Sequence, residues 1–178
     1  MTTACMASQR ISAIDALWYP EAGAINTPLA AAFACLDETG VQRRTHFIAG
    51  RFENLYLQRD SLPGLPQILD FAQAQAAHRL GKTFAELGLG FWLNAMGPGQ
   101  NTSKHSHEEN DEVLSAVYYV AAPAKSGDIL FQDPPFETRV SPQAGLLLLF
   151  SPELPHSVET NRSNQLRLSI ALNFRQSD

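Results

Sequence analysis

The chain has 178 residues, with 44% hydrophobic and 17% charged side chains, the composition of an ordinary globular protein of one domain. Its formal net charge of −5 is not offset by any basic stripe, so a nucleic-acid partner is not expected. The longest apolar runs, such as GLLLLF at 145–150, are too short to span a bilayer. Residues 1–10 contain no apolar core of signal-peptide length, so we expect a cytoplasmic protein with no membrane partner.

The beginning of the chain predicts supporting elements. Residues 1–10 are expected to form a flexible tail, and the β-rich run at 11–19 predicts a strand. Residues 26–40 predict a helix, because Thr27 can cap it and Pro28 suits its first turn.

A second pair of supporting elements follows. Residues 45–57 alternate around Gly50 and favour one or two strands. Residues 61–81 predict a helix that Gly81 ends. The residues expected to share its apolar face are Ile68, Phe71, Ala72, Ala76 and Leu80.

After residue 88 the sequence becomes a series of short β-rich runs separated by turn residues. These runs lie at 90–96, 114–121, 127–133, 145–151 and 166–174. Their number and spacing predict an antiparallel sandwich or barrel, with the two helices packed outside one sheet. We therefore expect a single α+β domain, mostly β, over 1–178. Within it, 11–88 would supply supporting strands and helices and 89–175 the barrel.

A group of possible metal ligands stands at the start of HSHEENDEVLSAVYYV, residues 105–120. If this stretch is extended, alternation puts its odd-numbered residues on one side. These include His105, His107, Glu109, Ser115 and Tyr119. Two imidazoles and a carboxylate at that spacing can converge on a divalent cation, with a further ligand from elsewhere. The alternative is a solvated acidic loop whose histidines are incidental.

Two later residues could complete such a site. His156 follows a long apolar run at the start of a predicted strand, and Arg167 opens the last strand with Ser169 on its face. A buried unpaired arginine is costly, and a small dicarboxylate is one natural partner for its guanidinium. The plain alternatives are a turn histidine and a strand-edge ion pair of Arg167 with Glu159 or Asp178.

These residues resemble a known family, the 2-oxoglutarate and Fe(II)-dependent oxygenases, and in particular a small bacterial group within it. The resemblance covers about residues 90–174, and Ala116 stands where that group usually has glycine. The matching pieces, in order, are H-x-[D/E] at 107–109, YYV at 118–120, SGDILFQDP at 126–134, His156, and R-x-S at 167–169. The resemblance implies a double-stranded β-helix, which is a jelly-roll or cupin-like barrel.

The resemblance also implies a set of site residues. Fe(II) would be held by His107, Glu109 and His156, a facial triad of two histidines and a carboxylate. A shifted register would instead give an all-histidine site that includes His105. The residues expected to contact the co-substrate 2-oxoglutarate are Arg167, Ser169, Tyr119 and Ser115, with Asn94 as a further candidate.

The implied activity is the hydroxylation of an unactivated C–H bond with O2, releasing succinate and CO2. The substrate would be a small molecule or a peptide, bound by segments such as 43–54, 97–104 and 133–139. A homodimer would be compatible with such a small enzyme. Two rival functions are a cupin-like metalloenzyme that does not use 2-oxoglutarate and a non-catalytic β-barrel binding module.

Overall fold

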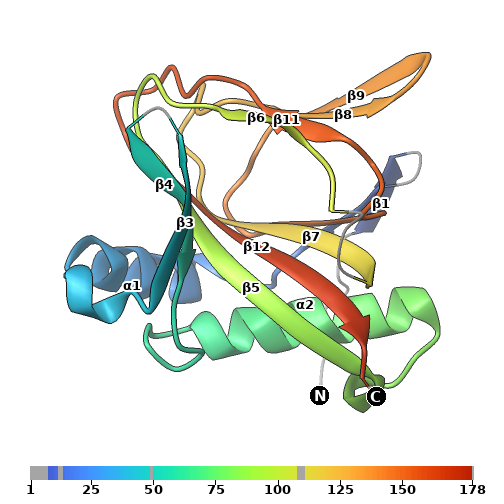
Figure 1. Ribbon diagram of the computed structural model, residues 1–178. Helices are drawn as coiled ribbons and strands as arrows, with labels where there is room; N and C mark the ends of the chain where they lie inside the picture. Colours follow the sequence, from blue (N-terminus) through green and yellow to red (C-terminus); the bar gives the residue numbers. More distant parts are fainter. Residues whose placement is uncertain (1–7, 12–13, 49, 108–110, 178) are drawn as a thin grey trace.

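The computed structural model describes residues 8–11, 14–48, 50–107 and 111–177 (Figure 1). Two helices, α1 (Ala22–Ala34) and α2 (Leu65–Leu80), precede most of the strands. The strands are β1 (Ser8–Ile11), β2 (Ile14–Trp18), β3 (Arg43–Ile48), β4 (Arg51–Tyr56), β5 (Leu87–Met96), β6 (Thr102–His105), β7 (Glu112–Ala121), β8 (Ile129–Asp133), β9 (Phe136–Val140), β10 (Leu146–Phe150), β11 (His156–Val158) and β12 (Arg167–Gln176).

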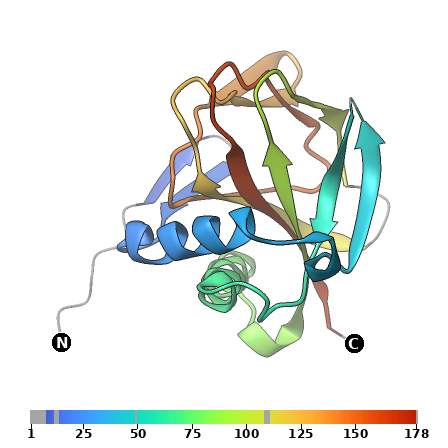
Figure 2. The same ribbon diagram turned by 90° about the vertical axis from the view of Figure 1, so that its left-hand side faces the viewer.

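The described strands form two antiparallel sheets that face each other. The large sheet has eight strands in the order β1-β2-β10-β7-β12-β5-β4-β3, and the small sheet has four in the order β6-β11-β8-β9. In both views α1 and α2 lie on the outer side of the large sheet, opposite the small sheet (Figures 1 and 2). The predicted fold class is therefore confirmed: a mostly β, double-stranded β-helix with two supporting helices.

The main hydrophobic core lies between the helices and the large sheet. Helix α2 contributes Ile68, Ala72 and Ala76, which the apolar periodicity predicted to face inward. Strand β12 contributes its even-numbered residues, such as Leu168 and Ile170. Each fully buried aliphatic side chain of this kind contributes about 1.5–3 kcal/mol relative to exposure. This core fixes the outer face of β12, and so its odd-numbered residues point between the sheets.

A second core joins the two sheets. Val117 and Phe150 of the large sheet pack with Ile129 and Phe131 of the small sheet. The Phe131 and Phe150 rings are 4.9 Å apart at their centres, with 63° between their planes. This apolar contact closes one part of the space between the sheets, and the rest of that space holds a cavity.

Several predicted elements are confirmed. The segment around Gly50 forms the β3–β4 hairpin, and Gly50 takes a φ of 81° that favours glycine. Gly81 ends α2 with a φ of 64°. Residues 8–10 differ from the expected tail, because they belong to β1, which pairs with β2.

The first helix begins earlier than predicted. It starts at Ala22, so Thr27 is not its cap and Pro28 lies inside it. Proline costs the helix one backbone hydrogen bond. The early turns are held from outside the helix, because the buried Asn26 accepts a hydrogen bond of 2.8 Å from the Tyr118 hydroxyl.

Of the three short strands β6, β9 and β11, only β11 was predicted, since His156 was expected at the start of a strand. Each is short, and two of them, TSKH and HSV, carry few apolar residues. No helix in the described part of the chain is long and apolar enough to cross a membrane.

Candidate metal and co-substrate site

A cavity of about 490 Å³ lies between the sheets. Strand β12 lines it with Arg167, Ser169, Ala171 and Asn173. Alternation predicted that Arg167 and Ser169 share this face. His105, His107 and His156 also line it. The structure therefore brings together all three histidines that the sequence pointed to and the predicted arginine.

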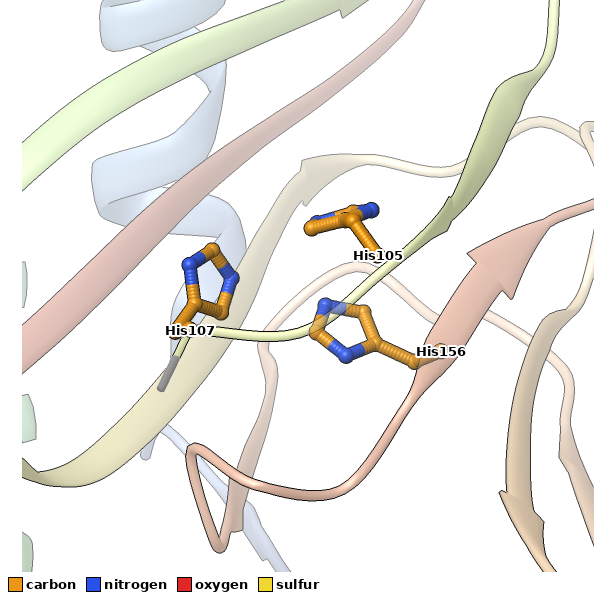
Figure 3. A group of neighbouring side chains, drawn as sticks. All are labelled: His105, His107 and His156. Atoms are coloured by element: carbon orange, nitrogen blue, oxygen red, sulfur yellow. The ribbon is translucent and has the colours of Figure 1, made fainter. Parts of the chain in front are cut away.

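The three histidines come from neighbouring segments of the small sheet. His105 ends β6 and pairs across the strands with His156, the first residue of β11, while His107 follows β6 by two residues. One side-chain nitrogen of each lies within 4.8 Å of the others. Figure 3 shows the three rings around a common space. Such a group of imidazoles can bind a divalent transition metal.

Backbone contacts orient two of these rings. His105 Nδ1 lies 2.9 Å from the Ser103 carbonyl oxygen, and His156 Nδ1 lies 3.0 Å from that of Leu154. Because a carbonyl only accepts, each Nδ1 must carry the proton and donate it. The lone pair of each ring is therefore on Nε2, the nitrogen that can bind a metal. A metal-binding histidine is usually oriented by such a hydrogen bond from its other ring nitrogen.

Burial keeps two of the histidines neutral. Burial first, and the neighbouring imidazoles second, lower the pKa of His156 to about 3 and that of His107 to about 4. The charged imidazolium is disfavoured because it loses hydration on burial and gains no anionic partner among the described residues. Near neutral pH both rings are thus in the form that binds metals.

The predicted carboxylate ligand, Glu109, lies in 108–110, outside the described residues. The triad of His107, Glu109 and His156 therefore stays a prediction. One premise behind it is wrong: β6 ends at His105 and β7 begins at Glu112, so residues 105–119 are not one continuous strand. The described geometry groups His105 with His107 and His156.

Arg167 is buried, with 2% of its surface exposed, and has no carboxylate partner among the described residues. Its Nη1 contacts Met96 Sδ at 3.8 Å, and its Nε has no hydrogen-bond partner in the described part. Glu159, a candidate partner from the sequence, instead pairs with Arg139 at 2.7 Å. Asp178, the other candidate, lies outside the described residues. A buried cation without an anion is costly, which favours an anionic ligand here.

Tyr119 lies beside this arginine. The Arg167 guanidinium carbon is 5.0 Å from the centre of the Tyr119 ring, and the buried Tyr119 hydroxyl has no hydrogen-bond partner among the described residues. Burial raises the pKa of Tyr119, although the positive charge of Arg167 opposes this. The hydroxyl is therefore a neutral donor available to a ligand.

The other predicted contacts are placed differently. Ser169 is buried on the cavity wall. The Ser115 hydroxyl donates to Asn173 Oδ1 at 2.9 Å, so its proton is used within the protein. Asn94 lines the cavity, and its Oδ1 accepts from Arg51 Nη1 at 3.2 Å.

Sequence reasoning missed one charged pair at the site. Arg51 of β4 forms an ion pair with Glu53 at 3.0 Å, and only 9% of each side chain is exposed. Arg51 also donates to Asn94 and to Thr102 Oγ1, so it links β4 to β5 and β6. From the sequence, this pair was included only within the segment 43–54, which was expected to bind the substrate. The signal that could have found the pair is its i, i+2 spacing, because that spacing puts both side chains on one face of a strand.

A known family matches the part of the chain that carries two of these histidines. Residues 90–140 match the family model described as "Putative 2OG-Fe(II) oxygenase". The resemblance to 2-oxoglutarate and Fe(II)-dependent oxygenases is thus confirmed. The match contains β5, β6, β7, β8 and β9, and with them His105 and His107. Among curated proteins, no sequence matches the chain significantly.

Solved oxygenase structures share the fold. A prolyl-4-hydroxylase from Pseudomonas putida has a TM-score of 0.68 and 20% identity, covering 93% of this chain and 89% of its own. The non-haem α-ketoglutarate-dependent carbocyclase SnoK from nogalamycin biosynthesis has a TM-score of 0.68 and 15% identity, covering 93% and 80%. EvdO2 from Micromonospora carbonacea var. aurantiaca, complexed with 2-oxoglutarate, has a TM-score of 0.64 and 16% identity, covering 97% and 94%.

The residues present fit the groups that this oxygenase family uses. The histidines offer neutral nitrogen donors on one side of the cavity. On the large sheet, Arg167 and the Tyr119 hydroxyl fit a carboxylate, since among the described residues Arg167 has no carboxylate partner and the hydroxyl no hydrogen-bond partner. The chain thus resembles 2-oxoglutarate and Fe(II)-dependent oxygenases in its sequence over residues 90–140 and in its fold.

Proposed function

We propose that this protein is a non-haem Fe(II)- and 2-oxoglutarate-dependent dioxygenase that hydroxylates an unactivated C–H bond. The single observation that carries the proposal is the shared cavity: a histidine cluster and a buried arginine without a carboxylate partner in the described part line the same 490 Å³ space. A metal site alone would need no arginine, and an anion site alone would need no converging histidines.

His107 and His156 would hold the metal through neutral imidazoles, and Glu109 would supply the carboxylate. His105 is the rival third ligand, because its Nδ1 is bound to the Ser103 carbonyl, which leaves the lone pair on Nε2, and its ring lies 4.3 Å from that of His156 at the centres. When bound, Fe(II) with 2-oxoglutarate and O2 supplies the oxidising power that inserts oxygen into a C–H bond and releases succinate and CO2.

The protein's own residues would hold and shield the co-substrate. Arg167 would pair with its far carboxylate through two N–H donors, and Tyr119 and Ser169 would add hydroxyl donors. Because these donors are buried, they gain strength from the low local dielectric. Val117, Ile129 and Phe150 form an apolar wall of the cavity and would exclude water.

The substrate would be a small molecule or a peptide that reaches the cavity beside the β3–β4 hairpin. Hydroxylation is itself proposed, because the fold does not determine the reaction: one protein with this fold is named a hydroxylase and another a carbocyclase. Hydroxylation is the simplest outcome, because it needs no further group from the protein.

A cupin-like enzyme without 2-oxoglutarate is the second candidate, and the three-histidine cluster is the observation that favours it. That function would not explain why the Arg167 cation is buried beside the cavity. A non-catalytic binding module would likewise leave both the histidines and the arginine unexplained.

The test is an anaerobic titration of the protein with Fe(II) and 2-oxoglutarate, read by the visible charge-transfer band of the chelated keto acid. The expected result is a band that disappears in His107→Ala and needs far more 2-oxoglutarate in Arg167→Ala. Metal binding without a band would favour the cupin-like enzyme, and no metal binding would leave only the binding module.

Two variants decide the third ligand in the same titration. If Glu109 binds the metal, Glu109→Ala loses the band and His105→Ala keeps it. The reverse pattern would assign the metal to the three histidines that the described geometry groups. Succinate formed in air, measured with and without a substrate panel, then tests turnover.

A further inference from the structure

His46 holds an unusual backbone conformation inside a strand. Its φ is 58°, and it is the one non-glycine residue with positive φ that lies within a strand of the described part. The strand pairs on either side are regular, Thr45 with Asn54 and Phe47 with Phe52, while the pair of His46 with Glu53 is missing. Left-handed conformation costs free energy in residues other than glycine. Such strain usually persists only where something is gained from it.

The strain changes where the His46 ring points. Strict alternation along β3 would put His46 on the face opposite to Thr45 and its partner Asn54. Instead, His46 Nδ1 lies 2.9 Å from Thr45 Oγ1 and 3.2 Å from Asn54 Nδ2. Asn54 and Tyr56 line the cavity, and so does His46. The positive φ therefore places the ring beside Thr45 and Asn54, and in this position His46 lines the cavity together with residues of both faces of the hairpin, such as Glu53 and Ile48.

These contacts also decide which ring nitrogen carries the proton. The Asn54 amide nitrogen can only donate, so His46 Nδ1 accepts, and the Thr45 hydroxyl can donate to the same atom. In the neutral ring the proton is then on Nε2. This is the opposite of His105 and His156, whose Nε2 atoms carry lone pairs. Nε2 of His46 is thus a hydrogen-bond donor, whereas Nε2 of His105 and of His156 carries a lone pair.

His46 lies on the exposed part of the cavity wall. Its side chain is exposed, as that of His105 is, whereas His107 is half-buried and His156 is buried. The hairpin stands at the edge of the large sheet (Figure 2). The same cavity has apolar and aromatic lining: Ile48 and Trp92 line it, and the Trp92 ring lies 5.9 Å from that of His107 at the centres.

We infer that His46 is a substrate-binding residue, whose Nε2–H donates a hydrogen bond to a carbonyl or carboxylate oxygen of the substrate. The apolar part of that substrate packs against Ile48 and Trp92. This inference rests on the proposed function and deepens it. It names the substrate class: a molecule with an apolar body and an oxygen acceptor, selected against a cationic counterpart that has no acceptor.

The tautomer is tested first. Protein labelled with 15N in its histidines is studied by long-range 1H–15N NMR, and His46→Gln assigns the His46 signals. The expected spectrum shows an unprotonated Nδ1 and a protonated Nε2. A His46 ring that carries its proton on Nδ1 would overturn the inference, because Nε2 could then only accept.

Recognition is tested with two probes of equal size, phenylacetamide and phenethylamine. The first offers a carbonyl acceptor, and the second, protonated, offers none. Binding is measured by calorimetry on the full chain loaded anaerobically with Fe(II) and 2-oxoglutarate, and on the metal-free protein. Wild type is expected to prefer phenylacetamide, and His46→Phe to lose roughly three- to tenfold in its affinity, the value of one neutral hydrogen bond.

Two further variants control this comparison. His46→Asn tolerates positive φ but has a shorter side chain, so it should also lose the preference while keeping the fold. His78→Phe changes an exposed histidine on α2 and should bind both probes as wild type does. Equal binding of the probes to wild type, no binding of either, or unchanged preference in both His46 variants would overturn the inference.

The same samples separate this inference from the proposed function. The charge-transfer band is recorded before each probe titration. A missing band overturns the proposed function whatever the probes do. A normal band with no preference that depends on His46 overturns only the role assigned to His46.

Discussion

The Arg167 guanidinium lies 5.0 Å from the centre of the Tyr119 ring, and both side chains keep a buried polar atom without a hydrogen-bond partner among the described residues. Arg167 Nε and the Tyr119 hydroxyl come from adjacent strands, β12 and β7. Burying such groups without a hydrogen bond costs free energy. The pair is therefore arranged for something that arrives from outside the chain.

Replacing Arg167 should separate stability from ligand binding. Arg167→Leu removes a buried charge that has no carboxylate partner among the described residues, so we expect the ligand-free protein to gain about 1–3 kcal/mol in free energy of unfolding. The same variant should bind 2-oxoglutarate roughly 100-fold more weakly or worse, since a charge-assisted bidentate contact is lost. Urea unfolding and calorimetric titration measure the two effects. The control is Arg175→Leu, on the exposed end of the same strand, which should change neither the free energy of unfolding nor the affinity for 2-oxoglutarate by much. An Arg167→Leu variant that binds 2-oxoglutarate normally would exclude Arg167 from the site.

The two neighbouring tyrosines should respond in opposite ways to loss of the hydroxyl. Tyr118→Phe breaks the 2.8 Å bond to Asn26 and leaves that amide buried, which should destabilise the fold by about 1–3 kcal/mol. Tyr119→Phe breaks no bond within the described residues, so its unfolding free energy should stay within about 0.5 kcal/mol of wild type.

For 2-oxoglutarate the order reverses. Tyr119→Phe should weaken its binding roughly three- to tenfold, while Tyr118→Phe leaves it unchanged. Thermal unfolding and the anaerobic chelate titration give the two readings on the same protein preparations. Equal effects of the two variants on binding would mean that Tyr119 does not face the co-substrate.

Acid should destabilise the metal-free protein through its buried histidines. The folded-state pKa values of His107 and His156, about 4 and about 3, lie below the ordinary value of 6.5. As the pH falls below 6.5, the unfolded chain binds protons that the folded chain refuses, so unfolding becomes easier. The loss should approach about 1.4 kcal/mol per pH unit for each histidine until the pH nears its folded pKa.

Urea unfolding at about pH 7 and about pH 5 measures this loss, because both values flank the start of the titration. His156→Gln should lose less stability between them than wild type does. A wild-type protein that is equally stable at both would mean that the histidines are hydrated in the folded state.

Gly127, within the motif at 126–134, should tolerate no side chain. Its φ is 94°, and a Cβ there would collide with the carbonyl oxygen of Glu159. Gly99 has a similar φ of 79° but open space where a methyl group would lie. Gly99→Ala should therefore cost only backbone strain, about 1–2 kcal/mol, whereas Gly127→Ala should cost clearly more. Thermal denaturation compares them, and equal losses would show that the Glu159 carbonyl moves aside freely.

The sequence predicted what depends on local periodicity. Alternation along β12 put Arg167 and Ser169 on the cavity side because that strand is long, regular and buried on its other face. It could not predict that His105 faces His156, since that pairing depends on the register of two short strands about fifty residues apart. The turn of the His46 ring was equally hidden, because it depends on one backbone angle that breaks the alternation.

The start of α1 shows the same limit in another form. The usual place of proline in a first turn predicted a helix beginning near Pro28, and tertiary contact of Asn26 with Tyr118 moved its start upstream. A rule about single residues has no access to such a contact. Glu109, by contrast, remains a prediction from the motif alone.

The histidines belong to the small sheet and Arg167 to the large one, and no backbone ladder of the described part joins these two sheets. A dicarboxylate bound at both ends would connect the two sheets, which otherwise meet through side chains such as Phe131 and Phe150. Weakening that aromatic contact would let the two sheets shift relative to each other. The distance between the metal site and Arg167 would then change, while the histidines would still bind the metal. Selectivity for co-substrate length would then be a property of how the sandwich is packed, as much as of the residues that touch the ligand.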